Sequence, residues 1–283
     1  MGTGSALGEG TMLGYLRNFP DNYVSGWGSG TGLAGVVGAL LILLFKIYDV
    51  QTKTLYLVIS PICFLYLLAF LITQKLYKKY INNKDVKIYE EDIVKLSDSD
   101  DTGNVSQNKN LNLKNVVKVF KKGHRFIVNL ALVYFLEYVV LSGLCDRIAK
   151  KGYVNDFKDT QYELFSLSYQ IGVFISRSSL FIVKHIKFVE IFTIFQFINL
   201  VIWIVEFYTG FITSAYLAFG HLVFVGLMGG SAYVGCFYFL LNSKEIHDNM
   251  KELGVNIAAI FNDVGILSSS ITILILDNSF MKI

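Results

Sequence analysis

The chain has 283 residues, of which 53% are hydrophobic and 17% are charged, against roughly 25% charged residues in soluble domains. A mean hydropathy of +0.50 excludes an ordinary soluble domain, and a scattered formal net charge of +3 excludes a nucleic-acid partner. The composition predicts a membrane protein whose main partner is the lipid bilayer.

Apolar stretches long enough to cross a membrane recur along the whole chain. A bilayer core about 30 Å thick requires about 20 apolar residues in a helix. Eight stretches bounded by charges or turns are candidates, and the first of them looks short. They cover residues 1–16, 24–46, 54–74, 125–145, 162–183, 188–207, 213–241 and 255–276. The pattern predicts an all-α, polytopic membrane protein.

A long polar stretch at 75–124 separates the third span from the fourth. It is rich in lysine, which favours the cytosolic side, and its middle part has no aromatic residue and cannot bury enough surface to offset chain entropy. We therefore predict a cytosolic, largely disordered linker at 75–124. It would join the remainder of an N-terminal helical bundle at 1–74, with about three spans, to a C-terminal bundle at 125–283, with about five. The loop expected at 146–161 would then lie on the non-cytosolic side. It is also basic, which argues against placing the linker in the cytosol.

The span at 162–183 contains a polar stripe. Glu163, Ser166, Gln170 and Arg177 follow one another at spacings of 3, 4 and 7, which places them on one face of a helix. A charge at the centre of a membrane helix costs about 2.5–3.5 kcal/mol, so the stripe is expected to face a bundle interior or a wet cavity. The alternative is that Arg177 reaches the headgroups and contacts anionic lipid. We favour the inward role, because Gln170 and Ser166 are too short to reach them.

Three carboxylates are also expected within spans. Glu137, which precedes Tyr138, is a natural counter-ion for Arg177, and the pair would either coordinate substrate or protons or merely lock two helices together. Glu9 and Asp263 could each take up a proton, because burial disfavours the charged carboxylate. A hydrogen-bonded helix contact is the alternative for both.

Glycine pairs four residues apart occur in three spans. Such pairs let helix backbones approach closely, with dispersion as the driving force. They fit bundles that rock against one another. The helix-packing residues predicted in this way are Gly26, Gly28, Gly30, Gly32, Gly226 and Gly230.

Motifs of enzymes and metal sites are missing from the sequence. There is no phosphate-binding loop, GxSxG, HExxH or CxxC motif, and the cysteines have no neighbouring histidine. We therefore expect no enzyme activity, no cofactor and no metal site.

Several segments resemble the battenin family of lysosomal and vacuolar membrane proteins. They follow the family's order along nearly the whole chain, and the SRSS and GLMGGSAYV blocks are specific to it. The segments are GEGTMLGYL (8–16), GWGSGTGLAG (26–35), VYFLEYVVLSGL (133–144), YQIGVFISRSSL (169–180), FVGLMGGSAYV (224–234) and NDVGILSS (262–269). The resemblance implies a fold similar to the major facilitator superfamily, with two helical bundles. The first bundle would be incomplete here, because the chain looks N-terminally truncated relative to the family.

The resemblance also implies functions. Family members are implicated in endolysosomal or vacuolar pH homeostasis, in basic amino-acid balance and in export of glycerophosphodiesters. Arg177 suits the oxygen pair of a phosphodiester, whereas a cationic amino acid would seek a carboxylate. We therefore expect a carrier-like protein of the lysosomal or vacuolar membrane, or of the late endosome, that exports a small polar metabolite. A glycerophosphodiester is favoured over a basic amino acid.

The expected roles follow from these inferences. The substrate cavity would be formed by Glu137, Tyr138, Tyr169, Gln170 and Arg177. Protons would be coupled by Glu9 or Asp263. One alternative is a non-transporting membrane scaffold that acts in lysosomal trafficking or pump regulation through the linker, and another is an ion channel or proton leak. The sequence indicates no particular protein partner.

Overall fold

The computed structural model describes most of the expected spans. The described residues are 8, 12, 21–62, 64–76, 79, 113–151, 159–247 and 250–279. The predicted span at 1–16, with Glu9, lies outside them apart from residues 8 and 12. Of the linker predicted at 75–124, the structure describes residues 75, 76, 79 and 113–124, and 113–124 are helical rather than disordered. Packing divides the chain into a first unit, Met1–Ile47 with Leu111–Ile283, and a second unit, Tyr48–Asn110. The boundaries predicted between the linker and the two helical bundles, at 74 and 124, stay a prediction.

Within the described residues, six helices are long and apolar enough to cross a membrane. They are Ser25–Ile47, Lys53–Leu76, Leu113–Lys151, Glu190–Thr209, Ala215–Leu241 and Lys251–Asn278. The prediction of an all-α, polytopic membrane protein is confirmed. The second unit contributes the helix at Lys53–Leu76, whose first part is α3 (Thr52–Ile59) and which continues past Pro61.

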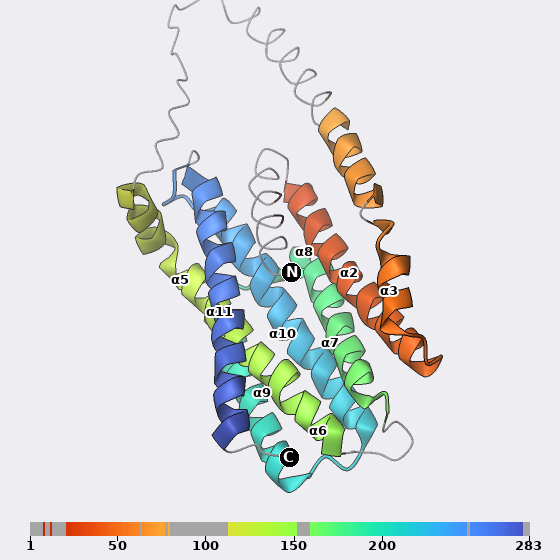
Figure 1. Cartoon of the computed structure of the whole chain (residues 1–283). Helices are drawn as coiled ribbons and strands as arrows, with labels where there is room; N and C mark the ends of the chain where they lie inside the picture. The colour runs from red at the N-terminus through yellow and green to blue at the C-terminus, as the bar shows by residue number, and fades with distance from the viewer. Residues whose placement is uncertain are drawn as a thin grey trace, which may run out of the picture. The chain divides into compact units, whose positions relative to one another are not determined.

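The first unit is a bundle of helices from both ends of the chain (Figure 1). Its elements are α2 (Asp21–Ile47), α5 (Leu113–Tyr138), the π-helix η1 (Val139–Cys145), α6 (Asp146–Lys151), α7 (Gln161–Ser178), α8 (Leu180–Val183), α9 (Glu190–Thr209), α10 (Ala215–Leu241) and α11 (Lys251–Ser279). Helix α7 packs mainly against α10 and α2, and α11 packs mainly against α5. The span predicted at 162–183 is thus divided into α7 and α8 at Ser179.

Glycine brings α7 and α10 close together. A Cβ atom at Gly226 would overlap the backbone carbonyl of Tyr169, and one at Gly172 would overlap that of Val223. A Cβ at Gly230 would lie 2.9 Å from the carbonyl oxygen of Val173. The two backbones therefore touch without intervening side chains, which is the close approach that small residues permit in membranes.

Helix α2 contacts α7 through one of its two glycine stripes. A Cβ at Gly28 would lie 3.3 Å from the Arg177 carbonyl oxygen, and one at Gly32 would lie 2.9 Å from the Cα of Phe174. Added Cβ atoms at Gly26 and Gly30 would meet no atom of the described residues within 4 Å. The packing role of that second pair stays a prediction.

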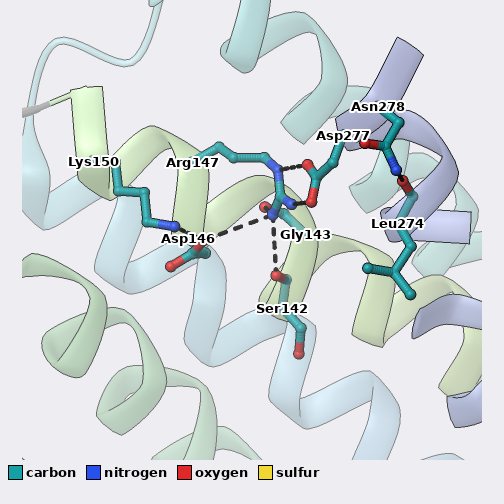
Figure 2. Close-up of polar contacts among 8 residues, drawn as sticks. All are labelled: Ser142, Gly143, Asp146, Arg147, Lys150, Leu274, Asp277 and Asn278. Atoms are coloured by element: carbon teal, nitrogen blue, oxygen red, sulfur yellow. Dashed lines mark hydrogen bonds and ion pairs between the residues drawn. The ribbon is translucent and has the colours of Figure 1, made fainter. Parts of the chain in front are cut away.

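The helix that contains the fourth predicted span extends beyond it at both ends. Its helix begins at Leu113, ahead of the predicted residue 125, and runs without a break through η1 to Lys151. The loop predicted to begin at 146 is therefore wrong for residues 146–151. Arg147 explains the difference: it pairs with Asp277 of α11 and donates to the carbonyls of Gly143 at 2.7 Å and Ser142 at 3.3 Å (Figure 2). These partners let a charged residue stay buried in the helix.

The glycine contact between α7 and α10 predicts a difference between two alanine variants. Gly226→Ala should destabilise the protein by about 1–3 kcal/mol, because the new methyl group overlaps a backbone that cannot move aside freely. Gly220→Ala on the same helix is the control, since a Cβ there meets nothing within 4 Å among the described residues. The melting temperatures of the purified proteins in detergent test this, and equal values would contradict it.

Candidate functional site

Arg177 lies in the last turn of α7, and its side chain points into the bundle. Its Nη1 donates to the hydroxyl of Thr31 on α2 at 2.8 Å, and its Nη2 donates to the hydroxyl of Tyr134 on α5 at 2.8 Å. The guanidinium carbon lies 3.9 Å from the ring centre of Tyr233 on α10, which is a cation–π contact. Side chains of three other helices therefore hold this cation, as the inward alternative requires.

Glu137 lies one turn after Tyr134 on α5 and is only 1% exposed. The Tyr169 hydroxyl of α7 donates to its Oε1, and Nε2 of Gln196 on α9 donates to its Oε2 at 2.9 Å. Helix α10 makes room for the carboxylate at Gly229, where a Cβ would overlap Oε2. Four helices thus meet at this single side chain.

A chain of hydrogen bonds continues from Glu137 through α9 to α10. Nε2 of Gln196 also donates to the backbone carbonyl of Val225 at 3.0 Å, and its Oε1 accepts from Nδ2 of Asn199 at 2.8 Å. The Oδ1 of Asn199 lies 3.0 Å from Nε2 of His221. The carbonyl of Val225 can only accept, so it fixes the orientation of both amides and requires the proton of His221 on Nε2.

The direction of this chain has a chemical consequence. Every donor between His221 and Glu137 points toward the carboxylate, and the Tyr169 hydroxyl approaches from the other side. Both carboxylate oxygens are therefore satisfied by protein groups in the buried interior of the bundle. The arrangement can hold a buried carboxylate in one fixed position.

The two charged residues do not pair directly. Among the ion pairs of the described residues, none joins Arg177 to Glu137, so the counter-ion contact expected from the sequence is absent there. Tyr134, which accepts from Arg177, lies one turn before Glu137 on α5. Tyr138 stacks on Tyr134 with ring centres 6.2 Å apart.

The remaining predicted residues lie around this cluster or apart from it. Gln170 fills the space beside Gly35, where a Cβ would lie 2.8 Å from its amide carbon, so it faces α2. Asp263 is half-buried on α11, and no hydrogen bond among the described residues joins it to Glu137 or Arg177. Within the described residues, no group of His, Cys, Asp and Glu could hold a metal ion.

Sequence reasoning missed the polar side chains of α9. Gln196, Asn199 and Glu206 follow one another at spacings of 3 and 7, which is the same kind of stripe that singled out α7. All three are buried, and Glu206 accepts from the backbone N–H of Ile212 at 2.7 Å just beyond the end of the helix. The stripe was a usable signal, but two of its members are uncharged amides that a search for charges passes over.

Comparison with known proteins gives a consistent result. A family model described as CLN3 protein matches residues 2–283. The chain is 35% identical to Battenin of Dictyostelium discoideum, covering 99% of this chain and 72% of that protein. It is 31% identical to Battenin of Canis lupus familiaris (94% and 60% covered) and 29% identical to Protein BTN1 of Yarrowia lipolytica (88% and 64% covered). No solved structure matches.

The enclosed carboxylate predicts a cost for removing one of its donors. Tyr169→Phe should lower the free energy of unfolding by about 1–3 kcal/mol, because an oxygen of Glu137 would lose its partner without gaining water. Tyr216→Phe on α10 removes the same group from a side chain that is 74% exposed, and it should have no measurable effect. Thermal unfolding of the two purified variants distinguishes them; a loss of stability in both would show that the contact with Glu137 is not the cause.

Proposed function

Because the chain belongs to the CLN3 protein family, we propose that it acts as a carrier-like, multi-pass protein of the lysosomal or vacuolar membrane. Its cargo is a small polar metabolite, with a glycerophosphodiester favoured over a basic amino acid, and its export supports pH homeostasis of the organelle. The chain spans 72%, 60% and 64% of the three relatives described above. The activity of a complete family member is therefore part of this proposal.

The position of the Arg177 guanidinium carries the proposal. It lies where α2, α5, α7 and α10 meet, held by Thr31 and Tyr134 and placed over the ring of Tyr233. Ionisable side chains inside a membrane bundle are costly and mark substrate or ion pathways. A guanidinium is a planar fork that matches two oxygens of a phosphodiester, whereas a lysine ammonium offers only a point charge.

The neighbouring groups fit a substrate site with both polar and aromatic walls. Tyr169 donates to the carboxylate of Glu137, Tyr138 stacks on Tyr134, and Gln170 lies on the α7 face toward α2. A cationic substrate would use Glu137, and this keeps the basic amino acid as the second cargo. Glu9 and Asp263 remain our candidates for proton coupling, since carboxylates in membrane spans serve as proton relays in transporters.

A specific observation favours a second function. Both oxygens of Glu137 already accept hydrogen bonds from Tyr169 and Gln196, as in a polar lock between helices. In that case the protein would be a non-transporting membrane scaffold in lysosomal trafficking or pump regulation. The charges would then act only on stability.

Metabolite profiling of purified lysosomes or vacuoles separates the two functions. Cells that lack the family protein are rescued with wild type, Arg177→Lys or Glu137→Gln at matched abundance. The carrier predicts that both variants accumulate glycerophosphodiesters as the null cells do, with Arg177→Lys failing because it keeps the charge but loses the fork. Arg125→Lys and Glu190→Gln are the matched controls, since these residues pair with each other and their side chains are 43% and 35% exposed.

The same experiment identifies the scaffold. Normal clearance by Arg177→Lys and Glu137→Gln, at wild-type abundance and location, would reject the substrate site. Accumulation of basic amino acids in Glu137→Gln alone would instead favour the second cargo.

A further inference from the structure

An apolar cavity of about 230 Å³ lies between η1, α9 and α11. None of its lining residues belongs to the cluster around Glu137 and Arg177. Its walls include Val139 and Leu144 of η1, Ile204 and Phe207 of α9, and Thr272 and Leu276 of α11.

The π-helical geometry of η1 shapes this cavity. A π-helix closes its hydrogen bonds from residue i to residue i+5, so side chains five positions apart share one side of the helix. Val139 and Leu144 are such a pair, and both line the cavity. Thr272 and Leu276 face them from α11, where a spacing of four places two side chains on one face. The cavity therefore follows from the regular geometry of two helices.

The α9 wall of the cavity reaches the surface of the bundle, where membrane lipid is expected. Ile204 and Tyr208 line it and are 40% and 66% exposed, so the α9 wall lies at the surface of the bundle. Tyr208 is in the last turn of α9, which Gly210 ends in a left-handed conformation with φ of 61°. A tyrosine at the end of a membrane helix is typical of the headgroup level. An occupant would therefore enter from lipid, near the interface.

A cation contacts one wall of the cavity. Nζ of Lys151 donates to the backbone carbonyl of Phe207 at 3.0 Å and lies 3.7 Å from the centre of the Phe207 ring. Among the described residues, the neighbouring cations have carboxylate partners: Lys150 with Asp146, and Arg147 with Asp277 and Asp146 (Figure 2). The partners that the structure gives Lys151 are neutral, so, of the three cations described in this segment, Lys151 is the one best suited to an anion beside the cavity.

We propose that this cavity is a binding site for an anionic phospholipid. One acyl chain fills the space between Ile204 and Thr272, and the phosphate group lies at Lys151, so that Phe207 contacts both ends of the ligand. A phospholipid of the bilayer carries both an apolar chain and a phosphate group. The site does not depend on Arg177 or on the transport proposed above.

Lipid retention measures the site directly. The full chain is reconstituted in vesicles of equal parts phosphatidylglycerol and phosphatidylcholine, extracted in mild detergent and examined by native mass spectrometry. Wild type should retain one phosphatidylglycerol in preference to phosphatidylcholine. Lys151→Gln should lower that retention about fivefold, the effect of one lysine near an anionic surface. Lys150→Gln is the matched control and should retain lipid as wild type does.

A second variant tests the acyl-chain part. Ile204→Trp fills the cavity from its lipid-facing wall, so it should lower retention of phosphatidylglycerol while the melting temperature stays within a few degrees of wild type. Three results would each overturn the proposal. They are equal retention of the two phospholipids by wild type, equal losses in Lys151→Gln and Lys150→Gln, and unchanged retention in Ile204→Trp.

Discussion

The bundle depends on one constraint, which is that a polar group inside a membrane must find its partners within the protein. Glu137 meets it with donors from α7 and α9 and with space at Gly229 of α10. The chain of amides then carries the constraint to His221, whose ring stacks on Trp203 with centres 5.8 Å apart. This hydrogen-bonded chain of five side chains, from Tyr169 to His221, therefore fixes α5, α7, α9 and α10 relative to one another. The side chains have little freedom to reorient.

Much of the fold could be predicted from apolar length alone. The spans expected at 188–207 and 213–241 agree within two residues with α9 and α10, because a turn at Gly210 separates two strongly apolar stretches. The start of α5 could not be predicted in this way. Its first turns are amphipathic and rich in lysine, so a search for apolar runs begins too late. The end of the same span was predicted too early, because a charged residue such as Arg147 normally marks the end of an apolar stretch. In the structure, Asp277 pairs with this charge.

The candidate site was predictable only in part, for a related reason. Spacing within α7 places Gln170 and Arg177 on one face of the helix, and the structure turns both toward α2 or the bundle interior. The partners could not be predicted, because they are distant in sequence: Thr31 is 146 residues from Arg177, and Gln196 is 59 residues from Glu137. Two opposite charges in neighbouring spans suggested an ion pair between Glu137 and Arg177. In the structure, a hydroxyl and an amide donate to Glu137, and two hydroxyls accept from Arg177.

The π-helix has a further consequence for how this sequence can change in length. A π-helix closes each hydrogen-bonded turn with one residue more than an α-helix does, so losing a single residue from η1 would return this turn to α-helical geometry and rotate the chain beyond it only slightly. Arg147 would then still lie near Asp277, and its charge would stay away from lipid, where it is costly. The same deletion in the α-helical part of α5 would rotate the end of the helix by about 100°. Within this long helix, η1 is therefore the segment that best tolerates the loss of a residue.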